Sequence, residues 1–278
     1  MSEAVVLKEV SLENKEETVL DGISLAFPGG SFTLVMGPSG SGKSVLLKVA
    51  CGLIPPTRGS VEQFGRPLIG LSQREEVEVR RRTGFGFQDS ALWQNMTVYQ
   101  NLALPIRYHD QSVKDVHLRR RIYTLLEPYG MAATQNSRPS DLSSGERKIV
   151  SYLRALMLEP EVLFLDEPLA SVDYQAGQKI TASIRELKSQ GRTIISASHS
   201  PQLASQLADY LLILKDGRVL VFDRFDEVVR SNDREVSSIL TDVLSQAASY
   251  DGDILSLLDD NASGDIMPGD STEGLIDE

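Results

Sequence analysis

A glycine-rich octapeptide near the start of the chain has the residue types that can hold a polyphosphate. It reads Gly37-Pro38-Ser39-Gly40-Ser41-Gly42-Lys43-Ser44 and fits the pattern G-x-x-x-x-G-K-[ST]. In this pattern the glycines let backbone N–H groups turn toward phosphate oxygens, the lysine reaches the β- and γ-phosphates, and the last hydroxyl binds Mg²⁺. A plain glycine-rich turn is the alternative, but every fixed position matches. The octapeptide therefore predicts binding of a nucleoside triphosphate with Mg²⁺.

Two carboxylates, Asp166 and Glu167, directly follow the apolar run Val162–Leu165. A continuous apolar run of this length is typical of a parallel strand that is buried on both faces. Acidic residues at the carboxyl end of such a strand lie where P-loop folds hold the metal and the water. We expect Asp166 to orient Mg²⁺ and Glu167 to polarise the attacking water. Alone, the pair could equally be two carboxylates that end a strand at the protein surface. Together with the octapeptide, it indicates triphosphate hydrolysis.

With four further motifs in order, the chain resembles the nucleotide-binding subunit of ATP-binding-cassette (ABC) transporters over about residues 5–245. The matching segments are Gln88 after Gly86-Phe87, Leu142-Ser143-Ser144-Gly145-Glu146 at the place of the LSGGQ signature, Leu169-Ala170-Ser171-Val172-Asp173 at the D-loop, and His199 at the switch histidine. The resemblance implies an α/β fold, namely a P-loop NTPase ABC cassette with a RecA-like core, an antiparallel β-subdomain and a helical signature subdomain.

The resemblance also implies what these residues do. Gln88 would contact Mg²⁺ and report on the membrane partner, and His199 would close on the γ-phosphate. In the family two cassettes form a head-to-tail dimer, in which Ser143 and the Gly145 N–H contact the γ-phosphate of ATP bound to the other subunit. Asp173 belongs to the D-loop of the same nucleotide site. ATP and Mg²⁺ are thus the implied cofactors, and we expect a homodimer of cassettes.

Two departures from the family pattern affect the nucleotide site. In the signature, Ser144 replaces a glycine and Glu146 replaces the usual glutamine. Ser143-x-x-Glu146 is also a capping box, which satisfies free N–H groups at the start of a helix over 146–158, whereas a carboxylate close to phosphate would lower the rate by repulsion. Second, Ser11–Thr18 lacks the aromatic residue that commonly stacks on adenine. Selectivity for the base therefore stays open, while triphosphate binding is expected.

The elements that must position these motifs are indicated by periodicity and turn residues. The expected strands are 32–36, 84–87, 162–165 and 193–196, with a hairpin over 210–222 that turns at Lys215-Asp216-Gly217, and the expected helices are 43–50, 72–82, 176–189 and most of 97–158, with Gly130 as a helix stop. We assign residues 1–245 to the ABC ATPase domain, with its helical subdomain at about 97–160. Residues 246–278 are assigned to an acidic C-terminal extension.

Composition and charge limit the classes of function. The 278 residues, 41% hydrophobic and 24% charged, have the composition of an ordinary globular protein. The net charge is −11, but nine of the 39 acidic residues and none of the 28 basic ones lie in 251–278, which leaves −2 on the rest. A body without basic excess argues against nucleic acid as a partner. We expect the acidic end to be a flexible tail; docking of its apolar residues on a partner is the alternative.

A single cysteine, Cys51, excludes an intramolecular disulfide framework and a cysteine-based zinc cluster. No apolar stretch approaches the roughly 18–20 residues that cross a bilayer, and the first residues do not have the pattern of a secretion signal. We therefore expect a cytoplasmic chain. The family resemblance implies that it is peripheral on the cytoplasmic face of the inner (plasma) membrane.

The segment after Gln88 indicates the kind of transporter. Residues 88–98 and 101–105 are similar to the ATPases of Mce-type lipid transporters, including those that maintain membrane lipid asymmetry (Mla). The implied partners are a transmembrane permease, docking near Gln88–Met96, and an Mce-domain protein. The residues expected to offer the permease an apolar surface are Ala91, Leu92, Trp93 and Met96, with the core as an equal alternative for Trp93.

Other functions stay open as alternatives. One is an ABC ATPase of another importer or exporter, for example for amino acids or lipoproteins. Another is a non-transport membrane ABC ATPase of the cell-division type. A third is a soluble ABC ATPase of translation or DNA repair. Two cassettes in one chain, a long coiled coil or a zinc insertion would favour the third, and the sequence contains none of these.

Overall fold

The strands predicted around the phosphate motifs form one mostly parallel sheet. The computed structural model describes residues 3–14 and 17–245. The strands of this sheet are β3 (Phe32–Met36), β6 (Thr83–Gly86), β7 (Val162–Asp166), β8 (Thr193–Ala197), β9 (Tyr210–Lys215) and β10 (Arg218–Arg224), in the order β10-β9-β3-β8-β7-β6. β10 pairs antiparallel with β9, as the predicted hairpin requires, and the other neighbours are parallel. The carboxyl ends of β3, β7 and β8 therefore meet at one edge.

A second, antiparallel sheet covers one face of the helix that follows the octapeptide. Its strands are β1 (Glu3–Glu13), β2 (Thr18–Pro28), β4 (Arg58–Gln63) and β5 (Arg66–Pro67), in the order β2-β1-β4-β5. Helix α1 (Lys43–Ala50) buries Leu46, Leu47 and Val49 against both sheets. This packing holds the start of α1 in place at the carboxyl edge of the parallel sheet.

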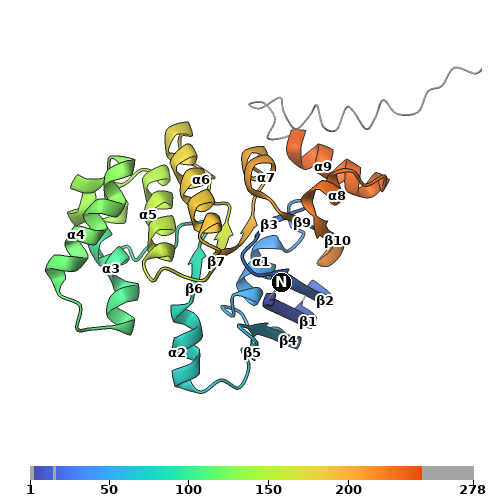
Figure 1. Ribbon diagram of the computed structural model, residues 1–278, viewed down its shortest axis with the longest axis horizontal. Coiled ribbons are helices and arrows are strands. Elements are labelled where there is room, and N and C mark those ends of the chain that lie inside the picture. Colours follow the sequence, from blue (N-terminus) through green and yellow to red (C-terminus); the bar gives the residue numbers. More distant parts are fainter. Residues whose placement is uncertain (1–2, 15–16, 246–278) are drawn as a thin grey trace, which may run out of the picture.

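The remaining helices lie mostly on the other face of the parallel sheet. They are α3 (Val98–His109), α4 (Asp115–Leu126), α5 (Ser144–Leu156), α6 (Tyr174–Ser189), α7 (Pro201–Leu207), α8 (Phe225–Val229) and α9 (Arg234–Ser245), while α2 (Gln73–Arg81) precedes β6. Figure 1 shows α3 and α4 at the opposite end of the molecule from β1, β2 and β4. Gly130 ends a short 3₁₀ turn after α4 with a left-handed φ of 71°, in agreement with the predicted stop.

The parallel strands alternate between two hydrophobic cores. In β3, Phe32 and Leu34 pack with the helices α3 to α7, whereas Val35 packs with α1 and the antiparallel sheet. In β7, Leu163 faces the first core and Phe164 the second. Successive side chains of a strand point to opposite faces, so each sheet residue serves one core only.

Beyond the hairpin, the structure contains helices that the sequence pattern did not predict. α8 and α9 follow β10, and Val236, Ile239 and Leu240 of α9 are buried in the core beneath the helices. The predicted acidic extension, 246–278, lies outside the described residues. Within the described ranges, no helix is both long enough and apolar enough to span a membrane.

Candidate active site

The octapeptide joins β3 to α1 as a loop that is held by the backbone on several sides. Gly42 is the residue before α1 and has a left-handed φ of 97°; a Cβ there would lie 3.0 Å from the Val19 carbonyl oxygen. The Ser41 N–H donates to the Pro38 carbonyl at 3.2 Å, and the Ser41 carbonyl accepts from the Gly217 N–H at 3.2 Å. The loop is therefore clamped between β2 and the β9–β10 turn, and only glycine fits where α1 begins.

The lysine and the hydroxyls of the loop have different surroundings. Lys43 Nζ donates to the carbonyls of Gly37 at 2.8 Å and Pro38 at 2.9 Å. Burial lowers the pKa of Lys43, and the carboxylates of Glu167 and Asp166 oppose that shift. The Ser41 hydroxyl is buried and has no hydrogen-bond partner among the described residues, so this cradle contains a free polar group as well as the N–H groups at the start of α1. These features fit a polyphosphate.

Ser44 and Asp166 come together across the edge of the sheet. The Ser44 hydroxyl on the first turn of α1 donates to Asp166 Oδ1 at 2.9 Å, and Asp166 is the last residue of β7. Burial raises the pKa of Asp166, while the Ser44 hydrogen bond and three lysines lower it. A hydroxyl and a carboxylate are hard oxygen ligands, and Mg²⁺ is commonly held by one or two protein oxygens with substrate phosphates. The pair therefore fits Mg²⁺.

Glu167 and His199 face each other beyond the ends of β7 and β8. His199 Nε2 lies 3.6 Å from Glu167 Oε1, and the Ser198 hydroxyl donates to Glu167 Oε2 at 3.3 Å. Burial raises the pKa of Glu167, as does the charge of Asp166. Burial and the charge of Lys43 lower the pKa of His199. Glu167 also has a left-handed φ of 48°, a conformation that is costly for a residue with a side chain and is often found at functional sites.

Gln88 follows β6, and its side chain is exposed. The backbone carbonyl oxygen of Gln88 accepts a hydrogen bond from Lys148 Nζ at 2.8 Å, and the same ammonium donates to the Asp166 backbone carbonyl at 3.2 Å. The backbone of Gln88 is thus tied to the end of β7. Direct contact of the Gln88 side chain with Mg²⁺ stays a prediction.

The signature segment begins α5, and its predicted capping box is confirmed. Ser143 Oγ accepts from the Glu146 N–H at 3.2 Å, and Glu146 Oε2 accepts from the Ser143 N–H at 2.8 Å. Gly145 packs on the D-loop, because a Cβ there would lie 2.8 Å from the Ser171 carbonyl oxygen. Asp173 Oδ1 accepts from the Ala176 N–H at 2.9 Å and so begins α6.

The signature and the D-loop line a common pocket of about 530 Å³, to which no residue of the octapeptide contributes. Ser143, Gly145 and Asp173 are among its lining residues. The structure therefore places the predicted site residues in two groups in one chain, one around Ser44, Asp166, Glu167 and His199 and the other with Ser143 and Gly145 at the start of α5. Asp173 lines a pocket with each group.

The segment Gln88–Met96 borders an apolar groove between the parallel sheet and α3. The groove has a volume of about 540 Å³, and its large exposed apolar residues are Leu53, Trp93 and Tyr108. Trp93 is 56% exposed, which decides against the core position. The expectation for Leu92 was wrong, because Leu92 is 8% exposed and packs in the core beneath the helices. Ser90 and Leu92 are buried in this loop while Ala91 and Trp93 are exposed, so only part of the segment faces outward, which explains the error.

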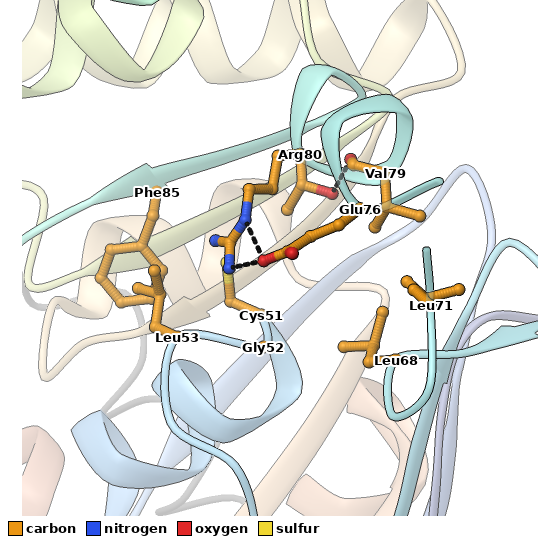
Figure 2. Close-up of a pocket in the computed structure, with 10 residues that line it drawn as sticks. Cys51, Gly52, Leu53, Leu68, Leu71, Glu76, Val79, Arg80 and Phe85 are labelled. Atoms are coloured by element: carbon orange, nitrogen blue, oxygen red, sulfur yellow. Dashed lines mark hydrogen bonds and ion pairs between the residues drawn. The ribbon is translucent and has the colours of Figure 1, made fainter. Parts of the chain in front are cut away.

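A smaller pocket of about 210 Å³ adjoins the groove and shares Leu53, Arg80, Thr83 and Phe85 with it. Figure 2 shows the ion pair of Glu76 and Arg80 lying between Leu53 and Phe85 on one side and the apolar side chains of the β5–α2 loop on the other. Burial raises the pKa of Cys51, in the same pocket, to about 12. The thiol is therefore protonated at neutral pH and unreactive.

Three residues at the site were missed by sequence reasoning. Ser198 directly precedes His199 in the sequence, and a hydroxyl next to a predicted catalytic residue was an available signal. Lys148 and Arg154 are cations of α5 that donate to carbonyls near Gln88. On the sequence they look like ordinary polar positions of an amphipathic helix, so no signal marked them.

Comparison with known proteins gives consistent matches. A sequence model described as "ABC transporter" matches residues 20–170. The intermembrane phospholipid transport system ATP-binding protein MlaF of Haemophilus influenzae is 30% identical over 237 residues, which is 85% of this chain and 89% of that protein. The methionine import ATP-binding protein MetN of H. influenzae is 34% identical over 216 residues, 77% of this chain but only 62% of that longer protein.

Among solved structures, a dimeric ATP-binding cassette in a post-hydrolysis state, bound to ADP and Pi, superimposes with a TM-score of 0.74. It is 29% identical, and the match covers 80% of this chain and 98% of that one. The predicted α/β cassette fold is confirmed by this likeness.

Proposed function

Because the chain belongs to the ABC transporter family and is an ATPase, we propose that it powers a separate membrane permease from the cytoplasmic face of the inner membrane. The observation that carries this proposal is the exposed apolar groove beside the nucleotide site, with Trp93 at its border and Gln88 tied to the end of β7. A groove with large exposed apolar residues is typical of a protein–protein contact.

The residues at the sheet edge divide the work of ATP hydrolysis. The octapeptide and Lys43 would hold the phosphates, and Ser44 with Asp166 would hold Mg²⁺, with Gln88 as a further ligand. Bound Mg²⁺ would neutralise charge on the phosphates. Glu167 polarises the attacking water, and its raised pKa suits a general base better than that of an exposed carboxylate. His199, 3.6 Å from Glu167, orients this carboxylate and would contact the γ-phosphate of bound ATP.

The second set of residues acts on the nucleotide of a partner cassette. The pocket of Ser143, Gly145 and Asp173 includes no residue of the octapeptide of the same chain, and the solved relative is dimeric. Both observations support a homodimer in which each signature covers the ATP of the other subunit.

Phospholipid is the proposed cargo, as part of a system that maintains membrane lipid asymmetry and includes an Mce-domain protein. The support is the likeness to MlaF over 85% of this chain, together with the segment after Gln88. Amino-acid import is the second candidate, because MetN is 34% identical. A non-transport role of the cell-division type would use the same groove.

The permease proposal is tested by affinity purification of the tagged chain from gently solubilised membranes of its host. A permease with an Mce-domain protein and bound phospholipid supports lipid transport; a permease with a substrate-binding protein supports amino-acid import. Division proteins would support the signalling role, and only soluble or ribosomal partners would overturn the proposal. Trp93→Asp is expected to abolish recovery of the permease, whereas Tyr123→Asp, at a 51% exposed position of α4 outside the groove, should not.

A further inference from the structure

A buried lysine connects three separate parts of the site. Lys148 lies in the second turn of α5 and is 4% exposed. Its ammonium donates to the carbonyl oxygens of Phe87 at 3.0 Å, Gln88 at 2.8 Å and Asp166 at 3.2 Å. An ammonium group has three protons to donate, and here each has a backbone acceptor. Lys148 therefore fixes the chain at Gln88 and at the end of β7 relative to one helix.

A second cation on the same helix holds the next part of that segment. Arg154 donates to the Ser90 carbonyl at 3.1 Å and to the Ala91 carbonyl at 2.8 Å. Ser90 and Ala91 have left-handed φ angles of 67° and 45°. Two successive residues with side chains in this conformation are costly and persist only where surrounding contacts hold them. Arg154 and Ala91 also line the apolar groove.

α5 thus has contacts at three places along its length. Ser143 precedes its first turn, which carries Gly145; its second turn carries Lys148, and its last turn carries Arg154. An α-helix of this length moves as a rigid unit, since its backbone hydrogen bonds are internal. Because β7 is also held by its pairing with β8, a displacement of α5 changes the position of Gln88 and Ala91 relative to the end of β7.

We propose that Lys148 is a positioning residue, which with Arg154 links the groove to the hydrolytic carboxylates by holding segment 87–91 and the end of β7 on α5. This inference rests on the proposed roles of Asp166 and Glu167. The hydrogen bonds of the Lys148 ammonium go to backbone carbonyls, so it acts by fixing where Gln88 lies relative to Asp166. Loss of the Lys148 ammonium leaves the nucleotide loop intact. It frees segment 87–91, which must keep a fixed position relative to Asp166 and Glu167.

The test compares three variants of the full chain with the unmodified protein. Lys148→Met keeps the length of the side chain without the charge, and Lys148→Arg keeps a cation. Lys188→Met is the matched control, because Lys188 also joins two elements, through the Leu207 carbonyl at 2.8 Å and Asp209 at 2.7 Å, away from the nucleotide loop. For each protein, kcat and KM for MgATP, the affinity for a fluorescent ATP analogue, and Tm are measured.

We expect Lys148→Met to lower kcat at least about tenfold, as loss of charge-assisted hydrogen bonds suggests, with affinity for the analogue unchanged within about twofold. Lys148→Arg should recover part of kcat, and Lys188→Met should lower Tm but not kcat. Trp93, the single tryptophan, lies two residues beyond this segment and so reports on its displacement. The Trp93 emission should shift to longer wavelength in Lys148→Met and not in Lys188→Met.

The inference is overturned if Lys148→Met keeps kcat within twofold, or if its kcat falls only in step with ATP affinity or with the folded fraction. An unchanged Trp93 emission in this variant overturns it as well. Turnover of Glu167→Gln distinguishes failure of the role proposed for Lys148 from failure of the proposed hydrolytic site. If Glu167→Gln abolishes turnover and Lys148→Met does not, the site stands and the role of Lys148 fails; normal turnover of Glu167→Gln overturns the assignment of the site itself.

Discussion

The edge of the parallel sheet and the helical region of α3 to α5 hold their functional residues in two different ways. At the sheet edge, Asp166, Glu167 and His199 follow directly from neighbouring buried strands, so backbone pairing between β7 and β8 places them. In the helical region, Gln88 and Ala91 are held by the long side chains of Lys148 and Arg154, which lie more than fifty residues further along the chain. Strand pairing places residues through many bonds at once, whereas the helical contacts depend on two side chains.

This difference predicts different responses to substitution. A group at the sheet edge keeps its position when a neighbour is changed, so its loss removes one chemical function and little else. A group in the helical region changes position when the lysine or arginine that holds it is replaced, so turnover falls in part and is not abolished. Three further experiments test the comparison, beginning with the largest effect.

Glu167→Gln should lower turnover by about 10²–10⁴, the usual contribution of a general base, while ATP binding is retained. The matched control is Glu161→Gln at the other end of β7, where Glu161 pairs with Arg82 at 2.7 Å on the surface; removal of such a pair costs about 1 kcal/mol or less. The rate of phosphate release at saturating MgATP measures the turnover of both variants. Equal turnover of the two variants would mean that the sheet edge is not where water is activated.

The pH dependence of kcat/KM should show an acid limb above pH 4.5, the ordinary pKa of a glutamate in the free chain. Burial raises the pKa of Glu167, and the base must be ionised, so activity is present above the raised pKa and falls as the pH drops through it. The fall approaches tenfold per pH unit below that value. Circular dichroism at each pH checks that the chain is folded, and the residual turnover of Glu167→Gln should lack this limb. An acid limb at or below pH 4.5 would contradict the assignment.

Two substitutions of Glu146 separate capping from electrostatics at the start of α5. Glu146→Gln keeps an acceptor for the Ser143 N–H and removes the charge, so Tm should be nearly unchanged while turnover rises by no more than about fivefold, the effect of a screened charge at a few ångströms. Glu146→Ala removes the reciprocal bond and should cost about 1 kcal/mol of stability. Thermal melting and phosphate release measure the two effects; a lower rate in Glu146→Gln would show that the carboxylate assists.

Most of the sheet edge was predictable from the sequence because its motifs are local. A buried strand, a loop or carboxylate at its end, and a following helix are contiguous, so residue type and order were enough to predict that Ser44 and Asp166 meet. The capping box of Ser143 and Glu146 was predictable for the same reason, since both partners lie within one helical turn.

The contacts of the helical region were not predictable, because they join residues far apart in the chain. Nothing in the sequence distinguishes Lys148 from a surface lysine, and the direction of Leu92 depends on a loop whose residues 90 and 91 have left-handed φ angles. α9 is a different case. Val236, Ile239 and Leu240 have helical spacing and are buried, so a signal was present and was not used.

The alternation of β3 and β7 between two cores bears on how such a protein changes over generations. Leu163 and Phe164 are neighbours in sequence but pack in separate interiors, so a substitution beneath α3 to α5 is not felt directly by the packing of α1. The core beneath α3 to α5 can then be repacked by substitution while the packing that holds α1 and the octapeptide keeps its shape. The parallel sheet thus separates the two hydrophobic cores, and sequence change on one side can accumulate with little effect on the packing of the other.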